Sequence, residues 1–257
     1  MSAPVTSAEI RLLGLDGIPE ITPGDDIGAM IGDAIEQSGH GFRPDDVLVV
    51  THKVVSKSEG RLVDLRSITP SEMATSIAER FGKDARQVEV VLRESSRIVR
   101  MDRGVIISET IHGFICANAG VDASNVASDT VCLLPIDPDA SAARLRSYLE
   151  NRFGVAAGVI ISDSFGRPWR VGIVNVAIGV AGLPPLADYR GFSDAAGYEL
   201  HVSVLAVADE LAAAAELVMN KLDARPVVLV RGYVPPVDAP PGTGRDLILD
   251  PGRDMFR

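Results

Sequence analysis

Val47-Leu48-Val49-Val50 is an uninterrupted apolar run that lies between an acidic pair, Asp45-Asp46, and Thr51. A short apolar run with polar residues at both ends predicts a buried strand. Two more runs, 155–161 and 226–230, predict strands for the same reason, and residues 171–181 form an apolar, glycine-punctuated stretch. The chain therefore contains several strands that a core must bury.

Amphipathic segments alternate with these runs and predict helices. Thr69-Pro70-Ser71-Glu72 predicts a helix start in which Thr69 is the cap, proline occupies the first position and Glu72 completes a capping box. The Asp84-Ala85-Arg86-Gln87 stretch repeats this logic. Residues 141–153 predict a helix that Gly154 ends, and residues 208–222 predict an alanine-rich helix.

The order of these elements favours one fold class. Residues 105–107 and 113–117 predict a hairpin, and 200–207 a strand. Because helices and strands do not alternate as regular β-α-β units, we expect an α+β fold with mixed sheets, packed helices and two closely joined lobes. We expect a domain over residues 1–233 and a proline- and glycine-rich, surface-draped or mobile extension over 234–257.

Composition excludes several classes of protein. The chain has 257 residues, 46% of them hydrophobic, and a net charge of −10, which argues against disorder and against broad binding of a nucleic-acid backbone. It has no apolar run long enough to cross a membrane and no signal-peptide pattern at its start. Cys116 and Cys132 each lie in an apolar run and are expected as buried thiols. We expect a cytoplasmic protein with neither nucleic-acid nor membrane partners.

Common catalytic signatures are absent from the sequence. It contains no Gly-x-x-x-x-Gly-Lys-Ser/Thr loop, no Gly-x-Gly-x-x-Gly after a strand and no Gly-x-Ser-x-Gly. The four histidines show no metal-binding spacing: His40, His52, His112 and His201. Any chemistry must therefore come from other polar segments.

Four segments qualify, each with a simpler alternative. Residues 15–21 form a glycine- and proline-containing turn that suits a flat ligand or an ordinary surface turn. Residues 51–60 contain two lysines after a strand, which predicts either an anion-binding site or a solvated loop. Residues 118–125 combine carboxylate, amide and hydroxyl groups. These groups could bind Mg²⁺ or Mn²⁺, or could stabilise a polar turn. Residues 160–170 place acidic and basic groups after a strand, which packing explains poorly.

Together these segments predict a metal–nucleotide enzyme. Asp122 and Asp163 would hold a divalent cation, while Lys57 and the arginines Arg167 and Arg170 would bind phosphate oxygens. Phosphoryl transfer depends mainly on such positioning and charge neutralisation.

At these segments the chain resembles the coenzyme F420-0:L-glutamate ligase family of deazaflavin-cofactor biosynthesis. The matching stretches run in family order from about residue 10 to about residue 232: 17–19, 55–61, 118–126, 134–139, 162–167 and 207–210. The resemblance implies GTP-dependent ligation of L-glutamate to coenzyme F420-0 through an acyl phosphate, with release of GDP and phosphate and later gamma-linked additions. It also implies two divalent ions, Mg²⁺ or Mn²⁺, together with K⁺ and a homodimer.

The resemblance assigns roles to individual residues. Asp122 and Asp163 match ligands of a first metal and Ser164 a ligand of a second, and these carboxylates with Lys57 and Arg167 form the expected catalytic set. The expected nucleotide contacts are Ile18, Pro19, Glu20, Ile21, His52, Lys53, Lys57, Asn125, Met219, Asn220, Lys221 and Asp223.

Three positions depart from the family pattern. Ser164 replaces the usual threonine, and His52 replaces a serine. Residues 219–225 read Met-Asn-Lys-Leu-Asp-Ala-Arg, where archaeal relatives carry glycines and a metal-binding glutamate. Lys221 cannot bind a cation, so Asp223 is the alternative ligand there.

Two other functions stay open at this point. A protein that binds the deazaflavin precursor or a nucleotide without turnover would also explain the altered 219–225 stretch and His52. A hydrolase using Ser162 or Ser164 is weakly supported, because no His–Asp pattern accompanies either serine. Bifunctional relatives carry a further flavin domain, so the chain resembles a stand-alone ligase or a ligase half.

Overall fold

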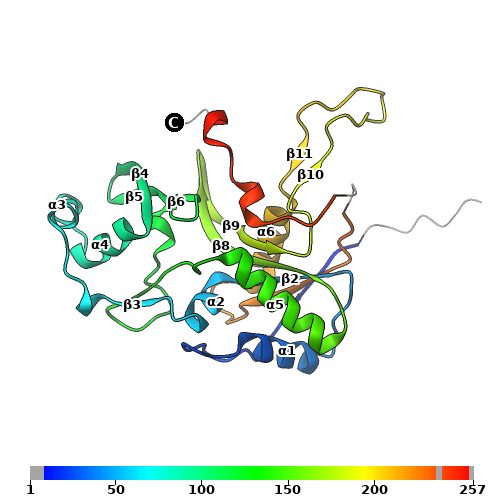
Figure 1. Ribbon diagram of the computed structural model, residues 1–257, viewed down its shortest axis with the longest axis horizontal. Helices are drawn as coiled ribbons and strands as arrows, with labels where there is room; N and C mark the ends of the chain where they lie inside the picture. The colour runs from blue at the N-terminus through cyan, green and yellow to red at the C-terminus, as the bar shows by residue number, and fades with distance from the viewer. Residues whose placement is uncertain (1–8, 236–238, 255–257) are drawn as a thin grey trace, which may run out of the picture.

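A five-stranded sheet lies at the centre of the computed structural model, which describes residues 9–235 and 239–254 (Figure 1). Strands β2 (Asp46–Thr51) and β8 (Gly158–Arg167) are parallel, and every other neighbouring pair is antiparallel. The strand order is β1 (Arg11–Gly14), β12 (Val227–Arg231), β2, β8 and β9 (Arg170–Ala181).

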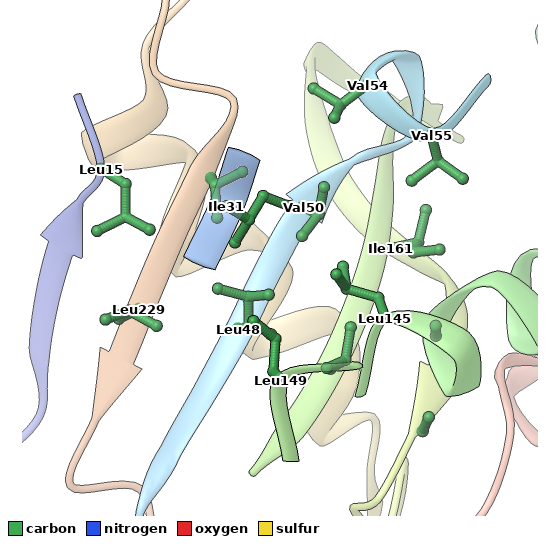
Figure 2. Close-up of a cluster of buried hydrophobic side chains, with 14 of the residues drawn as sticks. Leu15, Ile31, Leu48, Val50, Val54, Val55, Leu145, Leu149, Ile161 and Leu229 are labelled. Atoms are coloured by element: carbon green, nitrogen blue, oxygen red, sulfur yellow. The ribbon is translucent and has the colours of Figure 1, made fainter. Parts of the chain in front are cut away.

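Both faces of this sheet are covered. Leu48 and Val50 of β2 face a core shared with helices α1 (Ile27–Ser38), α2 (His52–Ser58) and α5 (Pro138–Phe153), as Figure 2 shows. Val47 and Val49 face the opposite core, beneath α6 (Val207–Met219). A strand buried on both faces needs apolar residues at every position, which explains the uninterrupted run at 47–50.

A smaller lobe has a core of its own. It contains α3 (Glu72–Phe81), α4 (Ala85–Arg93) and the antiparallel strands β4 (Ser95–Asp102), β5 (Val105–Thr110) and β6 (Ile115–Ala117). Its buried residues include Ile77, Val91 and Ile106. Strand β3 (Leu62–Asp64) pairs with β7 (Thr130–Cys132), and both lie in the segments that connect the two lobes. The prediction of an α+β fold with mixed sheets is confirmed.

The remaining short elements complete the chain. The strand pair β10 (Ala187–Asp188) and β11 (Val204–Leu205) forms an arm that extends away from the sheet in Figure 1. Single 3₁₀ turns are η1 (Leu65–Ser67), η2 (Asn118–Gly120), η3 (Gly244–Leu247) and η4 (Pro251–Arg253). No helix in the described ranges is both long and apolar enough to cross a membrane.

Most predicted elements are present, but several boundaries were wrong. Ser71, not Thr69, caps α3, because its hydroxyl accepts from the Ala74 N–H. The strand expected at 200–207 is only β11, since helix α6 already begins at Val207. Helix α6 ends at Met219, three residues early, and β8 continues to Arg167 through the expected loop. Helices α1 and α2 and strands β1, β3, β4 and β7 are among the elements that were not predicted, and α2 occupies the expected loop after β2.

The described part of the C-terminal extension packs against the main sheet. Gly244 is buried, and its N–H donates to Asp139 Oδ1 at 2.6 Å. The same oxygen accepts from the Val180 N–H at 2.8 Å, so one carboxylate joins α5, β9 and the extension. Residues 242–248 therefore pack against the folded body, while 236–238 and 255–257 lie outside the described residues.

One buried ion pair joins the central strands. Arg231 of β12 donates to both carboxylate oxygens of Asp46 on β2, at 2.7 and 2.8 Å. It also donates to the carbonyls of His40 and Gly41. The Asp46 side chain is fully buried, so each charge depends on the other for its compensation.

Replacing Asp46 by alanine is expected to destabilise the fold strongly. The Asp46→Ala change leaves the Arg231 guanidinium buried without a counterion, which costs about 3–5 kcal/mol. The urea concentration at the unfolding midpoint should fall, while the dependence of the unfolding free energy on urea concentration should stay unchanged. Glu9→Ala, which removes an exposed partner of Arg11, is the control and should leave the midpoint nearly unchanged. Equal midpoints for both variants would contradict the importance of the buried pair.

Candidate active site

The predicted site segments meet at one edge of the central sheet. Because β2 and β8 are parallel and Thr51 pairs with Ser162, the end of β2 lies beside the middle of β8. Strand β1 ends at the same edge, and β12 begins there, since the Thr51 N–H donates to the Pro226 carbonyl. Beyond Ser162, β8 pairs only with β9, so the side chains of Asp163 and Ser164 project beyond β2.

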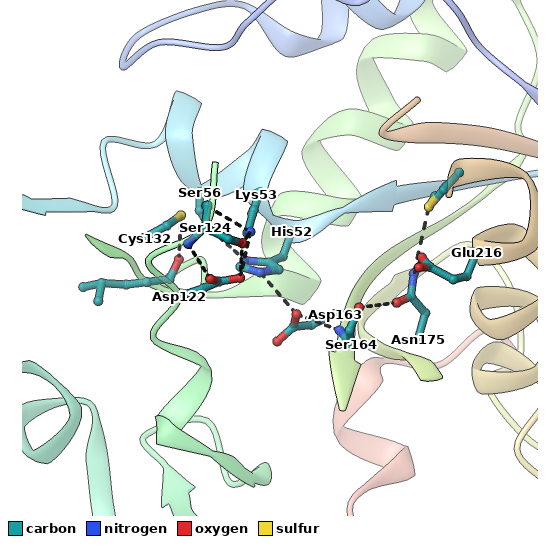
Figure 3. Close-up of polar contacts among 12 residues, drawn as sticks. His52, Lys53, Ser56, Asp122, Ser124, Cys132, Asp163, Ser164, Asn175 and Glu216 are labelled. Atoms are coloured by element: carbon teal, nitrogen blue, oxygen red, sulfur yellow. Dashed lines mark hydrogen bonds and ion pairs between the residues drawn. The ribbon is translucent and has the colours of Figure 1, made fainter. Parts of the chain in front are cut away.

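His52 connects two parts of this edge. It is the first residue of α2 and is 3% exposed. Its Nε2 lies 3.3 Å from Asp163 Oδ1, and its Nδ1 lies 3.2 Å from Ser56 Oγ (Figure 3). His52 therefore links the Asp163 carboxylate to Ser56 of α2.

Asp122 reaches the edge from the smaller lobe. The ammonium of Lys53, on α2, lies 2.7 Å from Asp122 Oδ2 and 3.1 Å from the Ser124 carbonyl. The Ser124 N–H and hydroxyl also donate to the Asp122 carboxylate. Burial alone would raise the pKa of Asp122, but Lys53 and Ser124 outweigh it and hold the pKa below its ordinary value. Asp122 is therefore ionised at neutral pH.

Ser164 belongs to a second polar group on the opposite side of Figure 3. Its hydroxyl donates to Asn175 Oδ1 at 2.6 Å, and Asn175 Nδ2 donates to Glu216 Oε2 at 2.7 Å. The Lys221 ammonium lies 2.8 Å from Ser164 Oγ and 2.9 Å from Glu216 Oε1. An ammonium thus already contacts the hydroxyl that was expected to bind a metal.

Lys57 and residues 18–21 form the remaining wall. Lys57 is 7% exposed, and its ammonium donates to Glu20, whose carboxylate is largely exposed. A buried ammonium beside an exposed carboxylate can exchange that partner for another anion without being left uncompensated.

These groups enclose a cavity of about 1100 Å³. Its lining includes fourteen of the predicted site residues: Ile18, Pro19, Glu20, Ile21, His52, Lys53, Lys57, Asp122, Asn125, Asp163, Ser164, Met219, Asn220 and Lys221. Arg167, Arg170 and Asp223 are not among them. Arg167 donates across the β8–β9 hairpin to the Val171 carbonyl, and Asp223 pairs with Arg225. A smaller cavity of about 310 Å³, beside Asp26 and Tyr148, contains none of the predicted residues.

Sequence reasoning missed two polar residues of the larger cavity, Asn175 and Glu216, and included Ser124 and Ser162 only as members of longer segments. Asn175 is a lone amide within the apolar stretch 171–181, and that interruption was its only signal. Glu216 resembles the solvent-facing charge of an ordinary helix. Ser162 is almost fully buried, and its hydroxyl has no hydrogen-bond partner among the described residues.

The donor set fits one divalent cation better than two. Asp122 and Asp163 offer carboxylate oxygens to one cavity, which suits Mg²⁺ or Mn²⁺. In the described ranges, no three His, Cys, Asp or Glu side chains cluster closely enough to hold a metal alone. Mg²⁺ is commonly held by one or two carboxylates together with substrate phosphates, so this site suits a metal that arrives with a nucleotide. The Lys221 ammonium at Ser164 does not fit a second cation there.

Comparison with known proteins identifies the family of this chain. The family profile "F420-0:Gamma-glutamyl ligase" matches residues 17–232. The chain belongs to this family.

Similar proteins cover nearly the whole chain. Coenzyme F420:L-glutamate ligase of Methanothermobacter thermautotrophicus is 48% identical, over 87% of this chain and 89% of its own length. The enzyme of the same name from Methanopyrus kandleri is 47% identical over 93% and 94%. That of Methanocaldococcus jannaschii is 41% identical over 97% of each chain.

Some residues of the family motifs hold the fold rather than line the cavity. Asp137 caps α5 by accepting from the Ala140 N–H, and Asp209 of α6 accepts from the Ala177 N–H in β9 at 2.8 Å. Burial raises the pKa of Asp209, and the Ala177 hydrogen bond offsets only part of this effect. Motif membership alone therefore does not identify a catalytic group.

Removing the charge of Asp163 is expected to weaken metal binding. Asp163→Asn keeps the size of the side chain but removes a carboxylate, and should weaken Mn²⁺ binding in the presence of GTP at least about tenfold. Titration calorimetry would measure the Mn²⁺ affinity of both proteins. Asp102→Asn, an exposed change in β4 of the smaller lobe, is the matched control. Wild-type Mn²⁺ affinity in Asp163→Asn would exclude this carboxylate as a ligand.

Proposed function

We propose that this chain is a GTP-dependent ligase that joins the amine of L-glutamate to a carboxylate of coenzyme F420-0 and then adds gamma-linked glutamates. Family membership and the relatives named coenzyme F420:L-glutamate ligase support glutamate ligation. The observation that carries the nucleotide part is that Asp122 and Asp163, from different lobes, line one cavity together with Lys53 and Lys57.

The proposed reaction first converts the carboxylate of coenzyme F420-0, a poor electrophile, into a better one. A carboxylate resists attack by an amine, so one of its oxygens first attacks the γ-phosphorus of GTP, and the bond to GDP breaks. The glutamate amine then attacks the acyl carbon, and the bond to phosphate breaks. The amine loses its proton, an amide remains, and the phosphate leaves with one oxygen of the original carboxylate. Positioning and charge neutralisation provide most of the catalysis in phosphoryl transfer.

The cavity residues have matching roles in this proposal. Asp122 and Asp163 would hold Mg²⁺ or Mn²⁺, which supplies positive charge to the phosphate oxygens when bound. His52 orients Asp163, and Lys53 orients Asp122. Lys57 would exchange Glu20 for a phosphate oxygen. The turn at 18–21 and Asn125 would contact other parts of the nucleotide.

A reconstitution experiment tests the function directly. Purified protein is incubated with F420-0, L-glutamate, GTP, Mn²⁺ and varied K⁺, and products are identified by mass spectrometry. We expect glutamylated product and GDP in equal amounts only when all three substrates are present. Label from ¹⁸O in the F420-0 carboxylate should appear in the released phosphate. GTP binding without product would instead favour a non-catalytic binding protein, and unlabelled phosphate would exclude the acyl phosphate.

Lys57 is expected to affect GTP more than glutamate. Lys57→Ala removes a charged hydrogen-bond donor, which should raise the KM for GTP roughly tenfold or more and the KM for glutamate much less. Initial rates at varied concentrations of each substrate would give both constants. Lys83→Ala in the smaller lobe is the control. Equal changes in the two constants would reject a specific role in nucleotide binding.

We also propose that the protein is a homodimer. Two hairpins expose apolar side chains: Val171 and Ile173 in β9, and Phe192 and Val202 in the arm between β10 and β11. The second half of the 171–181 stretch is buried in the sheet, so only its first residues are free for an interface. Light scattering should give twice the 27.2 kDa chain mass. A monomer at micromolar concentration would contradict this assembly.

A further inference from the structure

Four side chains of the cavity wall form a closed ring of hydrogen bonds. The Lys221 ammonium donates to Ser164 Oγ and Glu216 Oε1, at 2.8 and 2.9 Å. Ser164 in turn donates to Asn175 Oδ1, and Asn175 donates to Glu216 Oε2. Each contact supports the next, because the single Ser164 hydroxyl proton is used by Asn175 and leaves the oxygen to accept from Lys221.

The fold determines where this ring lies. Ser164 of β8 is directly opposite Asn175 of β9, and Asn175 is 3% exposed. Glu216 is in the last turns of α6, and Lys221 follows the end of that helix. Three separate elements thus place the ammonium at one point of the cavity wall. The contacts with Ser164 and Glu216 use two of the three N–H groups of the ammonium and leave one for a ligand.

The charges of the ring determine what it can bind. Glu216 supplies one negative charge, Lys221 supplies one positive charge, and the other two members are neutral. A divalent ion bound between Ser164 and Glu216 would occupy the position of the ammonium and be repelled by it. A phosphate oxygen, in contrast, would accept the remaining N–H, since an ammonium binds phosphate as a compact point charge.

We propose that Lys221 acts as a built-in cation in place of a second metal ion. The active site then binds one divalent ion, at Asp122 and Asp163, and the Lys221 ammonium binds a phosphate oxygen of GTP. Asn175 and Glu216 are positioning residues for this ammonium. The inference rests on the proposed metal–GTP function and concerns the number of metal ions that function requires.

Counting bound metal tests the proposal. Each protein is dialysed to equilibrium against GTP and increasing Mn²⁺, without F420-0 or glutamate, and the Mn²⁺ retained per chain is measured. We expect one ion in the wild type and two in Lys221→Met, which keeps a long side chain but frees Ser164 and Glu216. Lys221→Arg keeps the charge and should retain one ion, as should Lys83→Met, a control outside the cavity.

A second readout concerns GTP itself. Lys221→Met should weaken GTP binding about tenfold or more at low Mn²⁺, and excess Mn²⁺ should restore much of it, because the second ion replaces the lost charge. Lys221→Arg should retain most of the affinity. Thermal unfolding of each variant checks that the fold is intact.

The possible results separate this proposal from the ligase function. Two Mn²⁺ ions or none in the wild type, or a single ion in a folded Lys221→Met variant, would overturn the built-in cation. A wild type that retains one ion, with two in Lys221→Met, would support it even if no glutamylated product formed, and the missing product would reject the ligase alone.

Discussion

The parallel pairing of β2 with β8 is the constraint on which the rest of the molecule depends. Parallel strands must be joined by a long connection, and here it comprises the whole smaller lobe together with α5. The same pairing places the end of β2 beside Ser162 of β8, next to Asp163, at one edge of the sheet. The connection returns Asp122 to that edge, where Lys53 and Ser124 join it to α2. One pairing therefore creates both the two lobes and the cavity between them.

The predictable part of this structure was local in sequence. Uninterrupted apolar runs identified β2 and β12, because burial on both faces removes polar positions. Polar residues directly after β2 and within β8 identified Lys53, Lys57 and Asp163 as residues of one cavity. The residues that sequence reasoning missed depend on register instead. Asn175 matters because it lies opposite Ser164, and Glu216 because α6 crosses β9 there. The spacing of residues within one segment of the chain predicts neither of these contacts.

The incorrect boundaries have similar physical causes. Thr69 and Ser71 are both good caps, and the choice between them depends on the packing of Ala74 and Ile77 in the smaller core. The expected strand at 200–207 has the right alternation, but Val207 is drawn into the core beneath the sheet, so α6 begins there. Tertiary burial thus overrode a local pattern in both places.

The ion pairs of the cavity would allow an acidic protein to bind the proposed triphosphate. With a net charge of −10, the chain as a whole repels anions, yet ammonium–carboxylate pairs line its cavity: Lys53–Asp122, Lys57–Glu20 and Lys221–Glu216. A metal–nucleotide complex is also a combination of opposite charges. If the proposed complex enters, Asp122 can turn to the cation and Lys53 and Lys57 to the phosphates, while Lys221 keeps Glu216 and binds a phosphate oxygen through its remaining N–H. Because losing a partner is the costly event for a partly buried charge, an exchange of partners keeps the cost of binding low. A nucleotide without its metal would offer partners only to the ammonium groups, so this cavity should favour the complex over either component.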